Sequence, residues 1–69
     1  MNQLEIIING ETRRVASPAT VADLLRQLRL DPRTVVVELN RQIIRRPQLE
    51  DTKLAEGDAV ELVHFVGGG

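Results

Sequence analysis

The sequence contains no cysteine, tyrosine or tryptophan, and it holds a single serine, a single histidine and a single phenylalanine. Without cysteine, the chain can form no disulfide, thiolate nucleophile or thiolate metal site. Ser17 and His64 could act as a nucleophile and its base, but no acid is placed to orient the pair, and both suit ordinary turn and strand positions. An enzyme with its own catalytic centre is therefore not expected.

Long apolar runs and a strong net charge are also missing. A membrane-spanning helix needs about 18 consecutive apolar residues, and no stretch of the sequence approaches this length. Residues 1–5 lack the pattern of a signal peptide, so we expect a cytoplasmic protein. Nine basic and ten acidic residues give a net charge of -1, which argues against nucleic acid or an anionic membrane as the main partner. Eight Arg against five acids leave +3 on residues 1–49, and Lys53 against five acids leaves -4 on residues 50–69. This acidic final part could steer a basic partner or could be a solvated surface.

The chain has enough apolar residues for one small domain. Hydrophobic residues occupy 42% of the 69 positions, and a chain of this length supports one core and no second domain. Because no cysteine can cross-link it, packing alone must stabilise the fold.

The first half of the sequence predicts a β-hairpin followed by one amphipathic helix. Apolar residues alternate over positions 4–8, an Asn-Gly hairpin signal follows, and a return strand is expected over residues 12–16. Thr20 can cap a helix that should end near Leu30, because the residue before the next proline is biased away from helical geometry. The apolar face of this helix consists of Val21, Leu24, Leu25 and Leu28.

The second half predicts another hairpin and a final strand. A β-branched run over residues 35–39, an Asn-Arg turn and a pair of isoleucines form the hairpin. In the polar connection that follows, Leu49 and Leu54 should join the core, and the final strand is expected over residues 59–66. Five strands with one helix predict an α+β fold, in which a mixed sheet of about five strands carries one main helix on one face.

Two charged pairs lie in the connection before the final strand. Arg45 and Arg46 could grip a phosphate or a carboxylate, although the adjacent proline favours an exposed loop. Glu50 and Asp51 are adjacent rather than spaced as helical metal ligands, so solvated charges are the simpler interpretation. No metal site is expected.

The glycines Gly67, Gly68 and Gly69 form the main functional feature of the sequence. The predicted domain covers residues 1–66 and delivers these glycines directly after its final strand. They add nothing to packing, but a segment without side chains can thread a narrow tunnel, and three extended residues reach about 10 Å. The tail could therefore present a terminal carboxylate to another enzyme, or it could be a frayed terminus or a tag remnant.

A set of motifs spans essentially the whole chain. It comprises Ile6–Asn9, Thr20-Val21, Leu24-Leu25, Val37–Asn40, Ile43-Ile44, Gly57-Asp58, Val60-Glu61 and Val63–Gly69. With the order of elements, these motifs resemble the ubiquitin-like β-grasp proteins, and more closely the ThiS family of sulfur carriers in thiamin (thiazole) biosynthesis. A terminal Gly-Gly alone is weakly specific, whereas the complete ending on a chain of this length is specific.

This resemblance implies a protein cosubstrate rather than an enzyme. A ThiF-type adenylyltransferase would use ATP and magnesium to adenylate the carboxylate of Gly69, and sulfur from a persulfide donor, such as a cysteine desulfurase, would displace AMP. The resulting thiocarboxylate (1-thioglycine) would donate sulfur to an intermediate on a ThiG-type thiazole synthase. Gly67 and Gly68 would thread into the partner sites. The free protein is expected to bind no cofactor and to be a monomer.

The sheet face without the helix is a candidate partner surface. It should leave Ile7, Val63 and Phe65 partly exposed, and the phenylalanine could anchor the adenylyltransferase or the thiazole synthase. The alternative is that Phe65 packs under the loop around Leu49 and Leu54.

Other functions remain open on the sequence. The small sulfur-carrying subunit of molybdopterin synthase has a similar fold and ends in Gly-Gly, but such chains are usually longer and lack the ending Val63–Val66. A ubiquitin-like modifier that forms isopeptide bonds, or a β-grasp binding module without tail chemistry, is a third possibility. The proteins that copurify with the chain would distinguish these functions.

Overall fold

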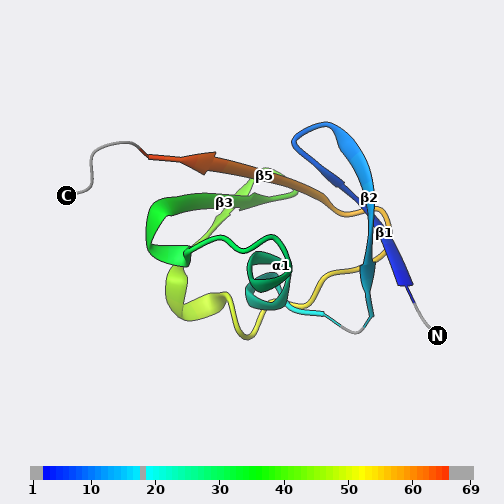
Figure 1. Cartoon of the computed structure of the whole chain (residues 1–69), viewed down its shortest axis with the longest axis horizontal. Helices are drawn as coiled ribbons and strands as arrows, with labels where there is room; N and C mark the ends of the chain where they lie inside the picture. Colours follow the sequence, from blue (N-terminus) through cyan, green and yellow to red (C-terminus); the bar gives the residue numbers. More distant parts are fainter. Residues whose placement is uncertain (1–2, 18, 66–69) are drawn as a thin grey trace.

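The computed structural model describes residues 3–17 and 19–65, and it has the order of elements that the sequence predicts (Figure 1). The strands are β1 (Gln3–Ile8), β2 (Glu11–Ala16), β3 (Val35–Leu39), β4 (Gln42–Ile44) and β5 (Ala59–His64). The helices are α1 (Val21–Gln27) and two short 3-10 helices, η1 (Pro32–Thr34) and η2 (Arg46–Gln48). Within the two described ranges, no helix is long and apolar enough to cross a membrane.

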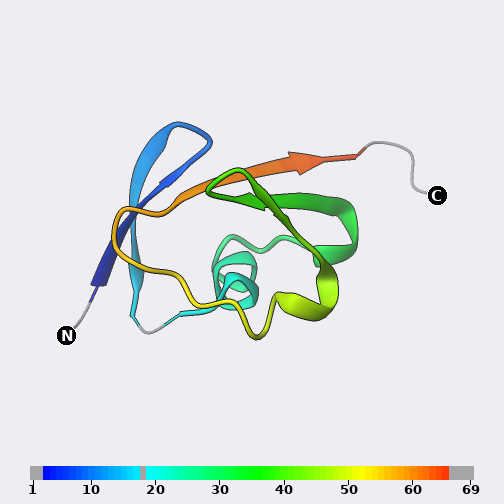
Figure 2. The same cartoon turned by 180° about the vertical axis from the view of Figure 1, so that it is seen from behind.

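The five strands form one mixed sheet in the order β2-β1-β5-β3-β4. β1 and β5 run parallel, whereas the other neighbouring strands are antiparallel. The last strand of the sequence therefore lies in the middle of the sheet. Figures 1 and 2 show α1 against one face of this sheet, and no other described element covers the opposite face. The predicted α+β, β-grasp architecture is confirmed.

The core lies between the sheet and α1, where the alternation of apolar residues predicts it. The side chains that are at most 1% exposed are Ile6, Val21, Leu24, Leu25 and Val60. Burial of each such side chain contributes about 1.5–3 kcal/mol relative to its exposed state. Leu49 and Leu54 are also buried in the core, which confirms that these two residues of the connection between β4 and β5 join it.

α1 begins at a capping box formed by Thr20 and Asp23. The Thr20 hydroxyl accepts a hydrogen bond from the Asp23 N–H at 3.1 Å, and the Asp23 carboxylate accepts one from the Thr20 N–H at 3.0 Å. The pKa of the Asp23 carboxyl lies below its ordinary value, chiefly because its carboxylate accepts the hydrogen bond from the Thr20 backbone. The Thr20 hydroxyl and the Arg26 guanidinium lower this pKa by smaller amounts. The predicted cap at Thr20 is confirmed.

α1 ends at Gln27, before the predicted end near Leu30. Arg29 adopts a left-handed φ of 60°, and its N–H donates to the Arg26 carbonyl at 3.0 Å. The Leu30 N–H donates to the Leu25 carbonyl at 2.9 Å. These two bonds form a Schellman motif, which satisfies the last carbonyls of a helix. The prediction that the following proline sets the helix end is therefore wrong, because the backbone turns at Arg29 first.

A turn around Asp31 leads from α1 into β3 and reaches the end of β5. The Asp31 carboxylate accepts hydrogen bonds from the Arg33 guanidinium and the Arg33 N–H, both at 2.9 Å. These bonds lower the pKa of Asp31 and raise that of Arg33. The Thr34 hydroxyl donates to the Asp31 carbonyl at 2.8 Å, and the Thr34 carbonyl accepts from the Phe65 N–H at 3.1 Å. The turn thus fixes the chain just after β5.

Candidate functional site

The sheet face opposite α1 carries exposed apolar side chains. Alternation along each strand turns every second residue away from the core. Ile7 is 39% exposed, Val63 58% and Phe65 53%, so the predicted exposure of all three is confirmed. Leu49 and Leu54 are buried in the core instead, and the alternative that Phe65 packs under their loop is wrong.

Ile43 is a further exposed residue of this face and is not among the predicted residues of the partner surface. Its side chain is 59% exposed. Ile44 lies opposite the buried Val37, so the preceding residue of the strand must point the other way, where it lies opposite Glu38. Two consecutive apolar residues in a short strand always occupy both faces, and this signal could have identified Ile43.

Two carboxylates also lie on this open face. Glu38 of β3 and Glu61 of β5 are directly opposite each other in the antiparallel register, and both line a hollow with Arg41. Among residues 3–17 and 19–65, neither carboxylate forms an ion pair, whereas Glu5 on the same face lies 3.7 Å from Arg14. The face therefore combines exposed apolar surface with negative charge that the described chain leaves without an ion pair.

Two asparagine side chains from turns hold β5 against its neighbours. The side chain of Asn9, which follows β1, accepts a hydrogen bond from the Leu62 N–H and donates one to the Leu62 carbonyl. Asn40, which follows β3, accepts from the Ala59 N–H at 3.0 Å and donates to the Asp58 carboxylate at 3.1 Å. Both asparagines have left-handed φ values, 48° and 50°, which this residue type tolerates better than most. These bonds hold the beginning and the middle of β5 between β1 and β3.

The predicted reactive end of the chain lies outside the described residues. This applies to Gly69, the predicted site of adenylation and thiocarboxylation, and to the threading residues Gly67 and Gly68. The predicted extent of the final strand, residues 59–66, is wrong at its end: β5 stops at His64, opposite Val35 where β3 begins, and Phe65 is already outside the strand. Val66 itself lies outside the described residues. The structure places the strand that leads to the glycines in the middle of the sheet, and their roles stay predictions.

Ser17 and His64 lie at opposite ends of the sheet. Gln3, where β1 begins, lies opposite Ala16, and Ser17 follows at this same end. β5 runs parallel to β1, so its last residue His64 is at the end where β1 finishes. The topology therefore does not bring a serine nucleophile and a histidine base together.

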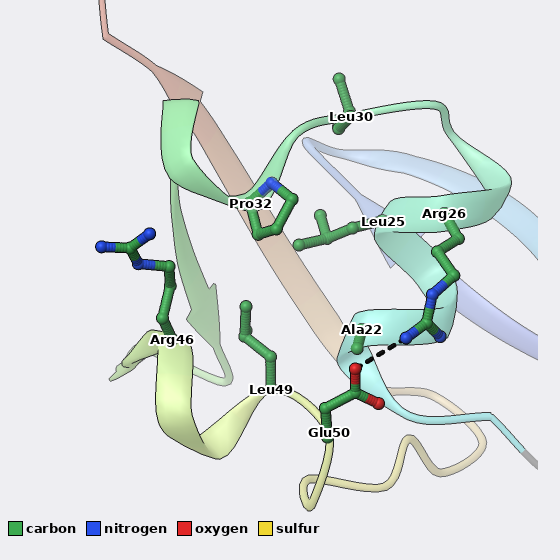
Figure 3. A pocket seen from close by; sticks show the side chains of 8 residues that line it. All are labelled: Ala22, Leu25, Arg26, Leu30, Pro32, Arg46, Leu49 and Glu50. Carbon is green, nitrogen blue, oxygen red and sulfur yellow. Dashed lines mark hydrogen bonds and ion pairs between the residues drawn. The ribbon is translucent and has the colours of Figure 1, made fainter.

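Arg46 lies beside a hollow of about 180 Å³ between α1, η1 and η2 (Figure 3). Arg26 lies on the opposite side of this hollow, where its guanidinium bonds the carboxylates of Asp23 at 2.7 Å and Glu50 at 2.6 Å. The apolar residues that line the hollow are Ala22, Leu25, Leu30, Pro32 and Leu49. Arg45 does not line this hollow, and both arginines are exposed, as the predicted exposed loop requires.

The acidic pair Glu50 and Asp51 is divided between different surroundings. Glu50 pairs with Arg26, whereas Asp51 is an exposed residue of the following turn. Among the residues that the structure describes, no group of three or more His, Cys, Asp or Glu side chains could hold a metal ion. Solvated and ion-paired charges therefore account for this pair.

Comparisons with known proteins agree with the motifs and the fold. Residues 6–69 match the ThiS family. The chain is 42% identical over 50 residues to the sulfur carrier protein ThiS of Bacillus subtilis (strain 168), and this match covers 72% of the chain and 76% of that protein. The crystal structure of a thiamine biosynthesis protein (ThiS) from Geobacter metallireducens is similar with a TM-score of 0.82 and 35% identity, covering 96% of this chain and 100% of that chain.

Two longer proteins contain a similar region. A thiazole synthase of Paramagnetospirillum magneticum is 38% identical over 66 residues, and a thiazole synthase of Magnetococcus marinus is 36% identical over 66 residues. Each match covers 96% of this chain and 20% of the other protein, so the chain spans about a fifth of the length of these two relatives.

Proposed function

Because the chain belongs to the ThiS family, we propose that it is a sulfur carrier protein of thiamine biosynthesis and a cosubstrate for partner enzymes. The observation that carries this proposal is the agreement of sequence and fold over nearly the whole chain with proteins named ThiS. The wide separation of Ser17 and His64 agrees with a carrier that relies on the active sites of its partners.

The reacting group in this proposal is the carboxylate of Gly69. A carboxylate is a poor electrophile because its leaving group would be oxide. One of its oxygens therefore attacks the α-phosphorus of ATP on a ThiF-type adenylyltransferase, which uses magnesium, and pyrophosphate leaves. The terminal sulfur of a persulfide, such as that of a cysteine desulfurase, then attacks the acyl carbon and AMP leaves. A thiol cleaves the remaining S–S bond and is itself oxidised to a disulfide, which releases the thiocarboxylate.

The acceptor of the sulfur in this proposal is an intermediate on thiazole synthase. A thiocarboxylate is a soft, anionic nucleophile, so it suits attack on an electrophilic carbon held by that enzyme. Support for the pairing comes from the two thiazole synthases that contain a region similar to this chain. The same relatives favour the thiazole pathway over the molybdopterin alternative.

The open sheet face is the proposed docking surface for these enzymes. Ile7, Val63 and Phe65 project from it, and β5 leads from it toward the glycines. Gly67 and Gly68 have no side chains, so they could pass through a narrow channel to place Gly69 at the chemistry. We expect a cytoplasmic location, where thiols stay reduced, and a monomer in the absence of partners.

The central test measures the mass of the intact protein isolated from its native cell. A gain of about 16 Da that hydrolysis reverses is expected for exchange of one oxygen for sulfur at the terminal carboxylate. Deletion of Gly69 should abolish ATP-pyrophosphate exchange by the adenylyltransferase while the thermal melt stays unchanged, because the reaction needs the carboxylate at one fixed depth. Full exchange with the deleted protein would contradict the role of Gly69.

A further inference from the structure

The cross-strand pair Glu38 and Glu61 is an unfavourable choice for the sheet itself. The two residues are directly opposite in the antiparallel register of β3 and β5. Like charges at directly opposite positions destabilise a sheet pair. Stability alone would therefore favour a neutral or basic residue at one of the two positions.

The surroundings of this pair are apolar. Val36 and Val63 form a cross-strand pair two positions away from Glu38 and Glu61, on the same face of the sheet. Val63 is 58% exposed. Ile43, opposite Glu38 on the other side, is 59% exposed. We define the carboxylate patch as the set of residues Val36, Glu38, Ile43, Glu61 and Val63. A protein surface that covers the patch must remove two carboxylates from water, which is costly unless it supplies a cation.

The ion pairs of the described chain involve other acids. They pair Arg14 with Glu5, Arg26 with both Asp23 and Glu50, and Arg33 with Asp31. Arg41 lines the hollow beside the patch, and within residues 3–17 and 19–65 it forms no ion pair with Glu38 or Glu61. The negative charge of the patch is thus available to a partner.

We infer that the carboxylate patch docks a protein surface that presents an arginine among apolar side chains, and that this surface belongs to thiazole synthase. A guanidinium is planar, carries five donors and is weakly hydrated, so it can bridge two adjacent carboxylates while its apolar neighbours cover Ile43 and Val63. Thiazole synthase is the chosen partner because this region occurs within two such enzymes. The inference rests on the proposed function and adds the chemistry of the recognition.

The test compares variants that remove or reverse the patch charge with a matched control. Glu38→Gln combined with Glu61→Gln removes two charges and keeps the shape of the patch. Glu11→Gln combined with Asp51→Asn removes the same net charge at exposed positions away from it. Glu61→Lys places an opposite charge beside Glu38, so it should stabilise the sheet pair and repel the arginine of the partner.

The measurement is calorimetric titration of each carrier variant into the thiazole synthase of the same organism, at low and high salt. The double Gln variant should bind about 10- to 100-fold more weakly at low salt and lose most of its salt dependence. Glu61→Lys should bind at least as weakly while its melting temperature stays equal or rises, and the control should change affinity less than about threefold. Equal affinities for patch and control variants would overturn the inference.

ATP-pyrophosphate exchange with the adenylyltransferase separates this inference from the proposed function. Wild type should support exchange in this assay. If the patch variants bind thiazole synthase normally and fail only with the adenylyltransferase, the assigned partner is wrong. If wild type supports no exchange, the proposed function fails, whatever the titrations show.

Discussion

The side chain of Asn9 acts as an additional rung of the sheet for Leu62. Its Oδ1 accepts from the Leu62 N–H at 2.8 Å, and its Nδ2 donates to the Leu62 carbonyl at 3.3 Å. The backbone pairing of β1 with β5 ends at Ile8 and Val60, so Asn9 continues the contact beyond the last true pair. A turn residue thus secures the strand that leads toward the tail.

Replacement of Asn9 by alanine should lower the free energy of unfolding by about 1–3 kcal/mol. Two hydrogen bonds are lost, and alanine must adopt the left-handed φ of 48°. Urea denaturation gives the value, and amide hydrogen exchange at Leu62 should become faster. The control is Asn9→Gly, which removes the bonds without the backbone strain and should cost less than alanine. A change below about 0.5 kcal/mol in both variants would show that the bonds contribute little to stability.

Replacement of Thr20 by alanine should cost about 1 kcal/mol, because the first turn of α1 loses its capping hydroxyl. Thr20→Ser keeps an oxygen in the same position and should restore most of this loss. Thermal melts of the two variants and the wild type test the prediction. Equal loss in the serine and alanine variants would attribute the effect to packing rather than to the cap.

The stability of the fold should fall with acid partly through Asp23. Its pKa is lower in the folded than in the unfolded state, so the unfolded chain binds the proton more tightly. The stabilisation is fully present above the ordinary pKa of about 4 and is lost as pH falls through the lower folded value. Asp23→Asn should show a smaller decrease in urea stability over this range than the wild type. Parallel curves would refute the contribution of Asp23.

Replacement of Phe65 by alanine should change stability by less than about 1 kcal/mol, because the side chain is 53% exposed. If the open face docks the partner enzymes, the affinity for them should fall by about 1–3 kcal/mol. Val60→Ala, at a buried position of β5, is the control and should lose about 2 kcal/mol of stability or more. Normal binding of both partners by the Phe65 variant would remove this residue from the docking surface.

The local patterns of the sequence predict most of the fold. Alternation assigns the core side of the first and last strands correctly for Ile6, Ile8 and Val60. His64, on the same face as Val60 in the predicted strand 59–66, is exposed because it lies at the strand end. Thr20 starts the helix because its cap depends on residues close in sequence. The predicted helix end is wrong because Arg29 occupies a left-handed position at which glycine is the usual residue. Propensity alone could not identify this position.

The parts of the candidate site that depend on long-range register could not be predicted. Glu38 and Glu61 are far apart in sequence, and only the pairing of β3 with β5 places them side by side. The bonds of Asn9 to Leu62 likewise join a hairpin turn to the final strand. A turn signal explains why asparagine suits position 9, but it contains no information on a distant partner.

The central position of β5 has a consequence for the order of folding during synthesis. β5 lies between β1 and β3, so the two hairpins cannot join into one sheet before Ala59–His64 has left the ribosome. Until then, the inner edges of β1 and β3 lack their neighbour and remain open to wrong pairing. Because the missing contacts are distant in sequence, closure of the sheet should be the slow step of folding. The strand that leads to the predicted reactive end therefore also completes the folded domain.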